Sequence, residues 1–347
     1  MPRIELPISK SIANRLLILQ AIHGDELMPV SDSMPGDVQL LHRALTTLHN
    51  PTQSYTTLHL SNCGTAMRFL TAYAAQLENR VTILDGVERM HHRPIGQLVD
   101  ALREIGADIE YLGEEGFPPL RIKGCILDKH RIVTINNSQS TQFVSALLLI
   151  GANVQTDSTS PYITLTRELI QRYTTLHNST QRYTIEKDWS SAAFWYEYVA
   201  LHGGEITLPG LSRESLQGDK VVADIFAHLG VYTEYTAEGI TLSPHRLIAS
   251  SPFAYNFSNC PDLYPAVALT CERLGIELHA TGTDSLPLKE SDRLRAIREH
   301  STNHDHRMAM ALLIAGYEVD DTACISKSYP QFLEYFNLLQ RKYSSDQ

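Results

Sequence analysis

Residues 97–122 and 220–242 share one pattern of hydrophobic and polar positions. Each stretch begins with apolar side chains at helical spacing and then reaches a glycine, Gly106 or Gly230. Alternating apolar and polar residues follow the glycine, which is the period of a half-buried strand. A turn with a Glu-Gly pair leads to a second short apolar stretch. The pattern therefore predicts a repeated unit of helix, strand, turn and strand in both halves of the chain, with the glycine just after the helix.

Short polar clusters precede several apolar helical stretches. They lie at residues 9–11, 62–65, 138–142, 188–191, 261–262 and 305–307. Serine, threonine, asparagine and aspartate are the usual N-cap residues, so helix capping alone is one interpretation. Lysine and arginine stand at many of the same helix starts, where a cation opposes the helix dipole at a cost of roughly a few tenths of a kcal/mol. Their recurrence indicates that these helix starts bind an anion.

Composition narrows the possible functions. The chain has 347 residues, enough for two domains, and a formal net charge of −10. This acidic balance argues against a general nucleic-acid-binding protein, which would need an excess of lysine and arginine. No apolar run is long enough to cross a membrane, and residues 1–6 show no signal-peptide core. The five cysteines are scattered and odd in number, which favours reduced thiols in a cytoplasmic protein.

Basic residues recur in motifs from both halves. Lys10 stands at a helix start, with Ser11 and Arg15 one turn apart on one helix face. Gly64 would let the backbone approach a ligand closely, and Pro94 is expected to be the first residue of a helix. Further cations lie in the stretches 89–93, 289–293, 305–307 and 326–328. Each motif alone also fits a solvated surface, but together they favour a phosphorylated ligand, because selecting one requires several fixed cations.

One short stretch offers metal-binding side chains. Residues 304–306 read His-Asp-His, which could ligate a metal. No second cluster of ligands accompanies this stretch, so the sequence predicts no metal site and no organic cofactor.

In their order and combination, the motifs resemble those of the 3-phosphoshikimate 1-carboxyvinyltransferase (EPSP synthase) family, in its Bacteroidetes-like form. The most specific stretches are NCGTAMRFL, RPIGQLVDAL, KESDRL and DHRMAMA. The resemblance implies an α/β fold of two domains, each built of βαβαββ repeats around a pseudo-threefold axis, an inside-out α/β barrel. It places residues 8–186 in the N-terminal domain and residues 1–7 with 187–347 in the C-terminal domain.

The resemblance also implies substrates and the residues that bind them. Phosphoenolpyruvate and shikimate 3-phosphate are the expected small-molecule partners of a monomer without nucleic-acid or membrane partners. The residues expected to bind shikimate 3-phosphate are Lys10, Ser11, Arg15, Ser140, Thr141, Gln142, Thr159, Asp262, Ser285 and Lys289. Those expected around phosphoenolpyruvate are Lys10, Asn62, Gly64, Arg93, Gln142, Arg293, His306, Arg307 and Lys327.

The implied reaction transfers the enolpyruvyl group to the 5-hydroxyl of shikimate 3-phosphate, on the route to chorismate and the aromatic amino acids. Asp262 is the expected base for that hydroxyl, and Glu290 and Lys10 are the expected proton carriers. A buried carboxyl can serve as an acid near neutrality, because burial raises its pKa. Closure of the two domains would exclude water from the intermediate.

The chain departs from the family pattern mainly by being short. The leading strand before Leu6 is nearly absent, and the segment between Leu169 and Glu186 is compressed. The strands expected between Leu294 and Asp305 are missing, which should leave an exposed sheet edge. In addition, Ile8 stands where the family usually has glycine, a substitution that would be costly at a positive φ angle.

Two alternatives to this function remain open at the level of sequence. One is the related enolpyruvyl transferase that acts on UDP-N-acetylglucosamine, which uses a loop cysteine that has no counterpart here. The other is a trimmed, inactive relative that serves as a binding protein, an interpretation motivated by the missing strands. Retention of the whole charged set argues against the second alternative.

Overall fold

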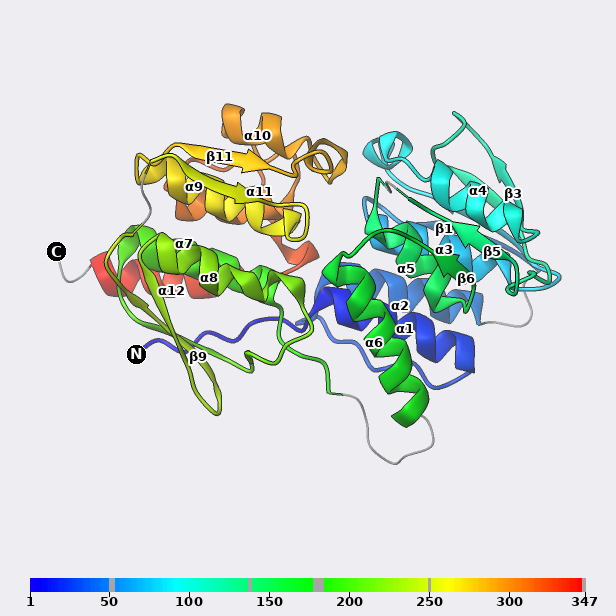
Figure 1. Cartoon of the computed structure of the whole chain (residues 1–347), viewed down its shortest axis with the longest axis horizontal. Coiled ribbons are helices and arrows are strands. Elements are labelled where there is room, and N and C mark those ends of the chain that lie inside the picture. Colours follow the sequence, from blue (N-terminus) through cyan, green and yellow to red (C-terminus); the bar gives the residue numbers. More distant parts are fainter. Residues whose placement is uncertain (50–53, 137–138, 177–183, 249–250, 345–347) are drawn as a thin grey trace. The chain divides into compact units, whose positions relative to one another are not determined.

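The fold is described from a computed structural model of the chain (Figure 1). It describes residues 1–49, 54–136, 139–176, 184–248 and 251–344. Ser138 and residues 177–183 of the compressed segment lie outside this range. The chain divides into two compact units: unit 1 comprises Met1–Lys10, Asp32–Gly36 and Ile185–Gln347, and unit 2 comprises Ser11–Ser31 and Asp37–Thr184.

These units are defined by packing, and they assign Asp32–Gly36 to unit 1. Packing alone does not tell which residues move together when substrate binds. The domain boundaries expected at residues 8 and 186 therefore stay a prediction.

Unit 2 contains one complete βαβαββ repeat. Its elements are β1 (Tyr55–His59), α3 (Gly64–Ala75), β2 (Val81–Asp85), α4 (Gly96–Glu104), β3 (Asp108–Tyr111) and β4 (Leu120–Lys123), with η1 (Glu88–His92) between β2 and α4. The sheet order is β1-β2-β4-β3, with β1 and β2 parallel and the other pairs antiparallel. The parallel pair requires a crossover, which α3 provides.

The rest of unit 2 is made of reduced repeats. One consists of β5 (Ile132–Thr134), α5 (Thr141–Leu149), β6 (Asn153–Gln155) and α6 (Pro161–Leu176), with β5 and β6 parallel. The other contributes α1 (Lys10–His23) and α2 (Gly36–Leu48).

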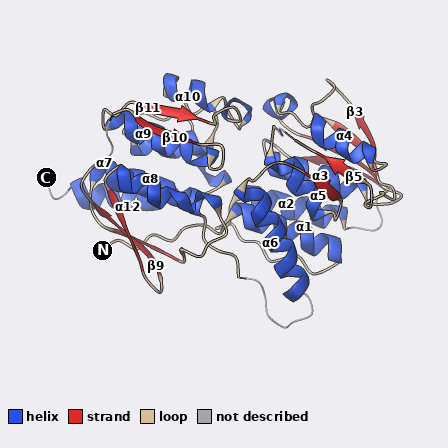
Figure 2. Cartoon of the chain, in the orientation of Figure 1, coloured by secondary structure: helices blue, strands red, loops and turns tan. Residues whose placement is uncertain are grey.

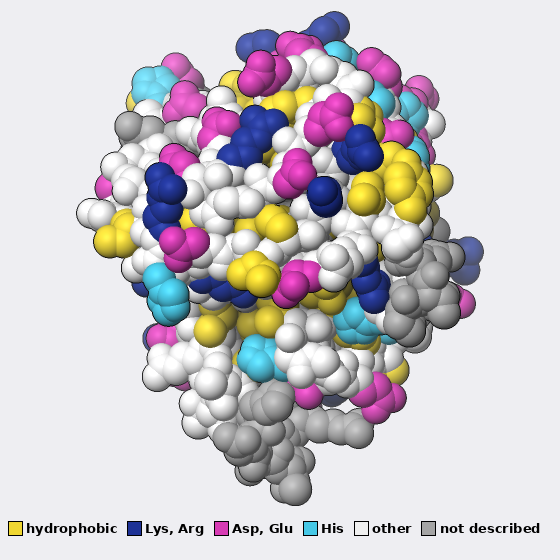
Figure 3. Space-filling model, turned by 90° about the vertical axis from the view of Figure 1, so that its right-hand side faces the viewer, with side chains coloured by type: hydrophobic (Ala, Val, Ile, Leu, Met, Phe, Trp, Pro, Cys, Tyr) yellow, Lys and Arg dark blue, Asp and Glu magenta, His cyan; other side chains and the backbone are white. Residues whose placement is uncertain are grey.

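On the face of the molecule in Figure 3, acidic, basic and apolar side chains are intermixed.

Unit 1 follows the same plan. Its first repeat is α7 (Trp189–His202), β7 (Ile206–Pro209), η2 (Gly218–Val221), α8 (Val222–His228), β8 (Val231–Tyr235) and β9 (Gly239–Pro244). The sheet order is β7-β9-β8, and all its pairs are antiparallel. Arg3 forms a parallel bridge with Thr207, so the first residues of the chain stand in for the nearly absent leading strand.

The remaining part of unit 1 is mostly helical, and its short strands form a small sheet (Figure 2). The second repeat is β10 (Phe253–Asn256), η3 (Pro261–Leu263), α9 (Tyr264–Arg273), β11 (Leu278–Thr281), η4 (Leu286–Leu288) and α10 (Arg293–Glu299). The third contributes α11 (His306–Ile314), η5 (Ala323–Lys327) and α12 (Phe332–Ser344). Helix α12 packs on α7, where the rings of Trp195 and Phe332 lie 5.2 Å apart.

The repeated unit predicted from the hydrophobic pattern is confirmed. It corresponds to α4-β3-β4 in unit 2 and to α8-β8-β9 in unit 1. Gly106 and Gly230 follow the two helices with φ angles of 101° and 91°, a region that side chains with a β-carbon rarely adopt. The expectation for Pro94 is wrong in detail, because α4 begins at Gly96 with Ile95 in the N-cap position.

The missing strands near the end of the chain are also confirmed. Between α10 and α11 the described chain forms a turn, in which His300, Asn303 and His304 have positive φ angles of 46°, 45° and 58°. The His300 ring stacks on Tyr317 with centroids 4.0 Å apart. Among the described strands, β10 and β11 form a sheet of two, so this repeat keeps the open sheet edge that the short sequence predicts.

Three central helices form the core of unit 1. Helices α7, α9 and α11 contact one another, and most of their residues are buried. A helix that is buried on all sides must be apolar on all sides, except where its ends reach polar partners. The polar side chains at the starts of these helices therefore require a specific explanation.

One buried polar residue in the core belongs to no helix end. Glu197 lies within α7 and is fully buried, and neither carboxyl oxygen has a hydrogen-bond partner among the described residues. Burial raises the pKa of Glu197 well above its ordinary value. The carboxyl therefore keeps its proton in the folded chain at a pH where the unfolded chain has lost it.

We predict that Glu197→Gln makes stability less dependent on pH. Because the pKa of Glu197 is raised in the folded chain, its contribution to the free energy of unfolding is complete below about pH 4.5. This contribution is lost as the pH rises toward the folded pKa. The loss is about 1.4 kcal/mol for each pH unit between the two pKa values. In urea unfolding at pH 5 to 8, the variant should become the more stable chain, by more than about 1 kcal/mol at the upper end.

The matched control is Glu104→Gln, at an exposed position of α4. It should follow the natural chain at every pH. Equal pH dependence of Glu197→Gln and the natural chain would contradict the prediction.

Candidate active site

The central helices of unit 1 begin at acidic residues. Asp188 caps α7 by accepting a hydrogen bond from the Ser190 amide at 2.9 Å, and Asp305 caps α11 by accepting one from the Arg307 amide at 2.9 Å. Asp262 lies in η3, directly before α9. The caps predicted at residues 188 and 305 are thus confirmed, and they explain why these acids lie at the buried ends of apolar helices.

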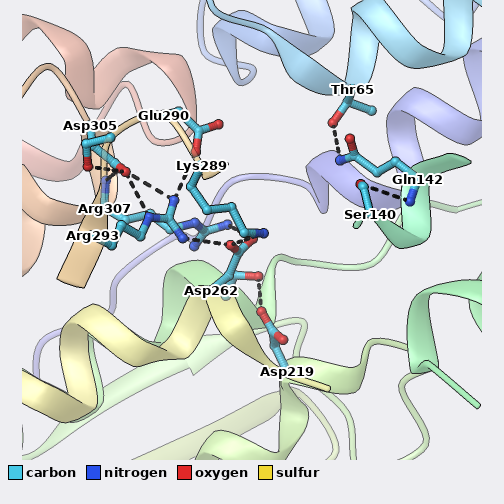
Figure 4. Close-up of polar contacts among 12 residues, drawn as sticks. Thr65, Ser140, Gln142, Asp219, Asp262, Lys289, Glu290, Arg293, Asp305 and Arg307 are labelled. Atoms are coloured by element: carbon cyan, nitrogen blue, oxygen red, sulfur yellow. Dashed lines mark hydrogen bonds and ion pairs between the residues drawn. The ribbon is translucent and has the colours of Figure 1, made fainter. Parts of the chain in front are cut away.

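Asp262 lies among three cations (Figure 4). Its Oδ1 lies 2.9 Å from Arg293 Nη1 and 3.3 Å from Lys289 Nζ, and its Oδ2 lies 2.9 Å from Arg307 Nη2. Burial alone would raise the pKa of Asp262, but Arg307, Lys289 and Arg293 hold it well below its ordinary value. In this arrangement Asp262 is a carboxylate and a weak base.

Arg293 links this carboxylate to two others. Its Nη2 lies 3.1 Å from Glu290 Oε2, and its Nε donates to Asp305 Oδ2 at 2.8 Å. Arg293 is 0% exposed; burial would lower its pKa, but Asp305, Asp262 and Glu290 raise it above its ordinary value. The buried guanidinium is therefore permanently charged, and it fixes three acidic side chains from three parts of the sequence.

Glu290 joins a further cation to the group, because its Oε1 lies 3.3 Å from Lys327 Nζ. Four cations, Lys289, Arg293, Arg307 and Lys327, thus meet Asp262 and Glu290 within unit 1. A cluster of this kind is able to bind an anionic ligand that competes with the two carboxylates for the same donors.

His306 adds a neutral polar group. It is 1% exposed, and neither ring nitrogen has a hydrogen-bond partner within the described part of the chain. Burial, followed by the charges of Lys10, Lys327 and Arg307, lowers the pKa of His306 well below its ordinary value. Buried polar atoms in native proteins nearly always have partners, so this imidazole is a candidate ligand-binding group.

Unit 2 brings together a second set of predicted residues. The side chain of Gln142 donates from Nε2 to Thr65 Oγ1 at 2.9 Å, and its Oε1 accepts from Arg68 Nη1 at 3.1 Å. Arg93 Nη1 donates to the Asn62 carbonyl at 3.0 Å. A β-carbon at Gly64 would lie 2.3 Å from Arg68 Nη1 and 2.6 Å from Arg93 Nη2, so only glycine leaves room for both guanidiniums.

Arg15 has interior partners. Its Nε donates to Thr166 Oγ1 at 2.7 Å and its Nη2 to Ser145 Oγ at 3.1 Å, while Nη1 donates to the Ser11 carbonyl at 2.8 Å. Burial lowers the pKa of Arg15 to about 10, which leaves it charged at neutrality. Its neutral partners position the guanidinium without cancelling its charge.

The other predicted residues are less constrained. Ser140 caps α5 by accepting from the Gln142 amide at 3.3 Å, and Thr141 is the first residue of that helix. Thr159 is exposed, and Ser285 is half-buried before η4. Ile8 forms an antiparallel bridge with Lys187 and does not have a positive φ angle. The backbone strain expected for isoleucine in place of glycine therefore does not arise.

Comparison with known proteins identifies the family. The sequence matches the model of the EPSP synthase family, 3-phosphoshikimate 1-carboxyvinyltransferase, over residues 2–174, 150–301 and 299–336. The chain belongs to this family. The resemblance drawn from the motifs is therefore confirmed.

Individual members of the family are similar to this chain over nearly its whole length. A 3-phosphoshikimate 1-carboxyvinyltransferase of Bacteroides fragilis is 36% identical, over 95% of this chain and 93% of its own length. One from Colwellia psychrerythraea is 29% identical, over 95% of each chain. The structure of EPSP synthase from Acinetobacter baumannii has a TM-score of 0.64 at 18% identity and covers 96% of this chain and 94% of its own, which confirms the expected fold.

The length of the alignment with one relative agrees with the shortened repeats of this family member. The match to the Bacteroides fragilis protein extends over 389 residues, whereas the present chain has 347. The relative therefore contains segments that this chain lacks. Those losses leave the charged cluster of unit 1 intact, because its members lie on η3, in the loop before α10, at the starts of α10 and α11 and at the end of η5, and not in the missing strands.

One residue beside Gly64 in unit 2 escaped sequence reasoning. Arg68 lies in the NCGTAMRFL stretch but is not among the predicted site residues, although it lies one helical turn after Thr65 and its guanidinium lies beside Gly64. The His-Asp-His stretch does not act as one group, since His304 is exposed and pairs with Asp321 at 2.6 Å whereas His306 is buried.

We predict that Asp305→Asn destabilises the chain by about 3 kcal/mol, because it removes one charge of a buried ion pair and leaves the Arg293 guanidinium less compensated. Asparagine still caps a helix, so loss of the cap does not account for the effect. Urea unfolding of the variant and the natural chain measures the difference.

The control is Asp292→Asn. Asp292 caps α10 by accepting from the Arg295 amide at 3.1 Å, and it is less buried than Asp305. This substitution should cost no more than about 0.5 kcal/mol. Similar losses in both variants would show that capping, and not the buried ion pair, is what Asp305 provides.

Proposed function

We propose that this chain transfers the enolpyruvyl group of phosphoenolpyruvate to the 5-hydroxyl of shikimate 3-phosphate. The products are 5-enolpyruvylshikimate 3-phosphate and phosphate. The observation that carries the proposal is the partly buried cluster of four cations around Asp262 and Glu290, in a member of the EPSP synthase family. Such a cluster suits substrates that bring both carboxylate and phosphate groups.

We assign the two substrates as the sequence predicts. Phosphoenolpyruvate is bound by Arg293, His306, Arg307 and Lys327 of unit 1, with contributions from Lys10, Asn62, Gly64, Arg93 and Gln142. Shikimate 3-phosphate is bound by Asp262 and Lys289, with Lys10, Ser11, Arg15, Ser140, Thr141, Gln142, Thr159 and Ser285. The phosphoenolpyruvate assignment is supported by the cations of its set. The shikimate 3-phosphate assignment is supported by the hydroxyl and amide groups of its set.

Ligand binding changes the electrostatics of the acids. The carboxylate and phosphate of phosphoenolpyruvate compete with Asp262 and Glu290 for the guanidiniums. Once the cations turn to the ligand, Asp262 regains basicity, because its lowered pKa depends on Arg307, Lys289 and Arg293. Substrate binding itself therefore converts Asp262 from a weak base into an effective one.

The reaction then needs three proton transfers, two in the addition step and one in the elimination step. Asp262 takes the proton of the 5-hydroxyl while the hydroxyl oxygen bonds to C2 of phosphoenolpyruvate, and C3 gains a proton from Glu290 or Lys10. The resulting tetrahedral intermediate loses the C3 proton back to the same group as the C2–O bond to phosphate breaks. The guanidiniums stabilise the negative charge of carboxylate and phosphate throughout.

The direct test is release of phosphate from phosphoenolpyruvate in the presence of shikimate 3-phosphate. Release that requires both substrates supports the proposal. Release that requires UDP-N-acetylglucosamine instead supports the related transferase. No release with either acceptor supports a binding protein without activity. A monomeric state and a cytoplasmic location remain predictions alongside this activity.

We predict that Asp262→Asn lowers kcat by 100-fold or more, in the range of about 10² to 10⁴ that general base catalysis contributes. Asparagine keeps the size of the side chain but takes up no proton. Phosphate release measures kcat, and thermal unfolding checks that the variant is folded. Turnover at the rate of the natural chain would remove Asp262 from the role of base.

We predict that Gly64→Ala weakens phosphoenolpyruvate binding and leaves the fold intact. The added β-carbon meets the far ends of two flexible side chains, Arg68 and Arg93, which move aside at little cost in stability. Their displacement should raise the KM for phosphoenolpyruvate about tenfold, a loss of about 1.4 kcal/mol.

The control for this variant is Gly113→Ala, where the nearest atom to the new β-carbon lies at an ordinary 3.5 Å. It should leave both KM values unchanged. An equal rise in the KM for shikimate 3-phosphate in Gly64→Ala would indicate general damage to the site and contradict the assignment.

A further inference from the structure

The turn that replaces the missing strands is hydrogen-bonded to the segment before η5. The Thr302 hydroxyl donates to Asp320 Oδ1, and His304 Nδ1 lies 2.6 Å from Asp321 Oδ2. Thr302 is fully buried, whereas His304 has a positive φ angle of 58° and a mostly exposed ring. Two successive acidic residues therefore hold this turn, at sequence separations of 18 and 17 positions from their partners.

Asp321 also holds the start of the short helix η5. Its Oδ1 accepts hydrogen bonds from the Ala323 amide at 2.9 Å and from the Cys324 amide at 3.3 Å. Amides in the first turn of a helix have no partner within the helix, so a side-chain oxygen satisfies them. The two oxygens of Asp321 thus have separate tasks, because Oδ1 fixes the first turn of η5 and Oδ2 meets His304.

The helix η5 ends at Lys327, and the residues beyond it are fixed in the core. The buried Tyr329 hydroxyl donates to the Glu5 carbonyl at 2.9 Å and accepts from Trp195 Nε1 at 3.3 Å. The backbone of Lys327 is therefore held from the C-terminal side by core contacts and from the N-terminal side by Asp321.

The same turn leads directly into α11. The Asp305 amide donates to the Thr302 carbonyl at 2.9 Å, and Asp305 begins the helix that carries Arg307. Lys327 reaches the charged cluster from η5, because its Nζ lies 3.3 Å from Glu290 Oε1. The turn thus joins two parts of the chain that supply cations to one cluster.

We propose that Asp321, supported by the bond between Asp320 and Thr302, is a positioning residue that holds η5 and so places the Lys327 ammonium for phosphoenolpyruvate. The inference rests on the proposed function, in which Lys327 binds this substrate. A lysine side chain is long and flexible, so a loose backbone would add to the conformations from which it must be selected. When a binding group is in place for only a fraction of the time, the affinity for the ligand falls by that fraction.

Two substitutions at position 321 test the assignment. Asp321→Ala removes the bonds to the η5 amides and to His304, and should raise the KM for phosphoenolpyruvate by about fivefold or more. The values of kcat and of the KM for shikimate 3-phosphate should stay within about twofold, because bound phosphoenolpyruvate restores the position of Lys327. Asp321→Asn keeps an oxygen for the η5 amides and should keep all three constants within about twofold.

The natural KM for phosphoenolpyruvate in Asp321→Ala overturns the proposal, and so does an equal rise in both KM values. The matched control is Glu318→Ala, which removes one negative charge from an exposed position of the same loop. It should leave both KM values unchanged. A rise as large as that of Asp321→Ala would assign the effect to the charge of the loop and overturn the positioning role.

A second pair of variants tests the buried bond of the turn. Thr302→Val removes the hydroxyl that donates to Asp320 and keeps the shape of the side chain, whereas Thr302→Ser keeps the hydroxyl. The valine variant should raise the KM for phosphoenolpyruvate about threefold, and the serine variant should not. This pair decides the question if thermal unfolding shows that Asp321→Ala does not fold. Equal KM values in the valine and serine variants overturn the proposal.

The hold on η5 is measurable without substrates. Amide hydrogen exchange at residues 323–329 reports local opening of this segment. In Asp321→Ala these amides should exchange at least about tenfold faster than in the natural chain, while the amides of α7 keep their rates. Equal exchange of residues 323–329 in the two proteins overturns the proposal.

Failure of the two proposals can be told apart. If the natural chain releases no phosphate with either acceptor, the proposed function falls, and the role of Asp321 in substrate binding falls with it. If the natural chain is active and Asp321→Ala keeps its KM for phosphoenolpyruvate, only the positioning role falls.

Discussion

The ion pairs of Arg293 constrain the rest of unit 1. A guanidinium with no exposure to solvent is tolerated only when carboxylates surround it, and Asp262, Glu290 and Asp305 supply them. These acids lie on η3, on the loop before α10 and at the cap of α11. The starts of these elements must therefore meet at one point, and the packing of the central helices is the arrangement that allows it.

The same constraint prepares the cluster for a ligand. Its cations already have partners within the chain, so an incoming anion replaces one set of acidic partners by another and leaves no buried cation alone. The exchange alters the basicity of Asp262, because that basicity depends on how many cations remain beside it. In the proposed mechanism, binding and catalysis are thus coupled through a shared set of ion pairs.

Shortening of the chain spared this arrangement for a physical reason. The strands missing after α10 belong to the outer part of a repeat, where a turn with three residues of positive φ takes their place. The helix starts are held by Asp188 and Asp305, by the η3 turn and by the ion pairs themselves. A fold built of repeats can lose outer strands while its central helices, which bury the most apolar surface, keep their positions.

The sequence alone determined the local elements and the kinds of chemistry. Apolar periodicity, the glycines after α4 and α8 and the caps at Asp188 and Asp305 all depend on neighbours a few residues apart, so they were predictable. The motifs also indicated cations at helix starts, and their resemblance to a family gave the fold. Only the tertiary structure decided that Arg293 joins three acids, because burial and charge at that site come from residues distant in the chain.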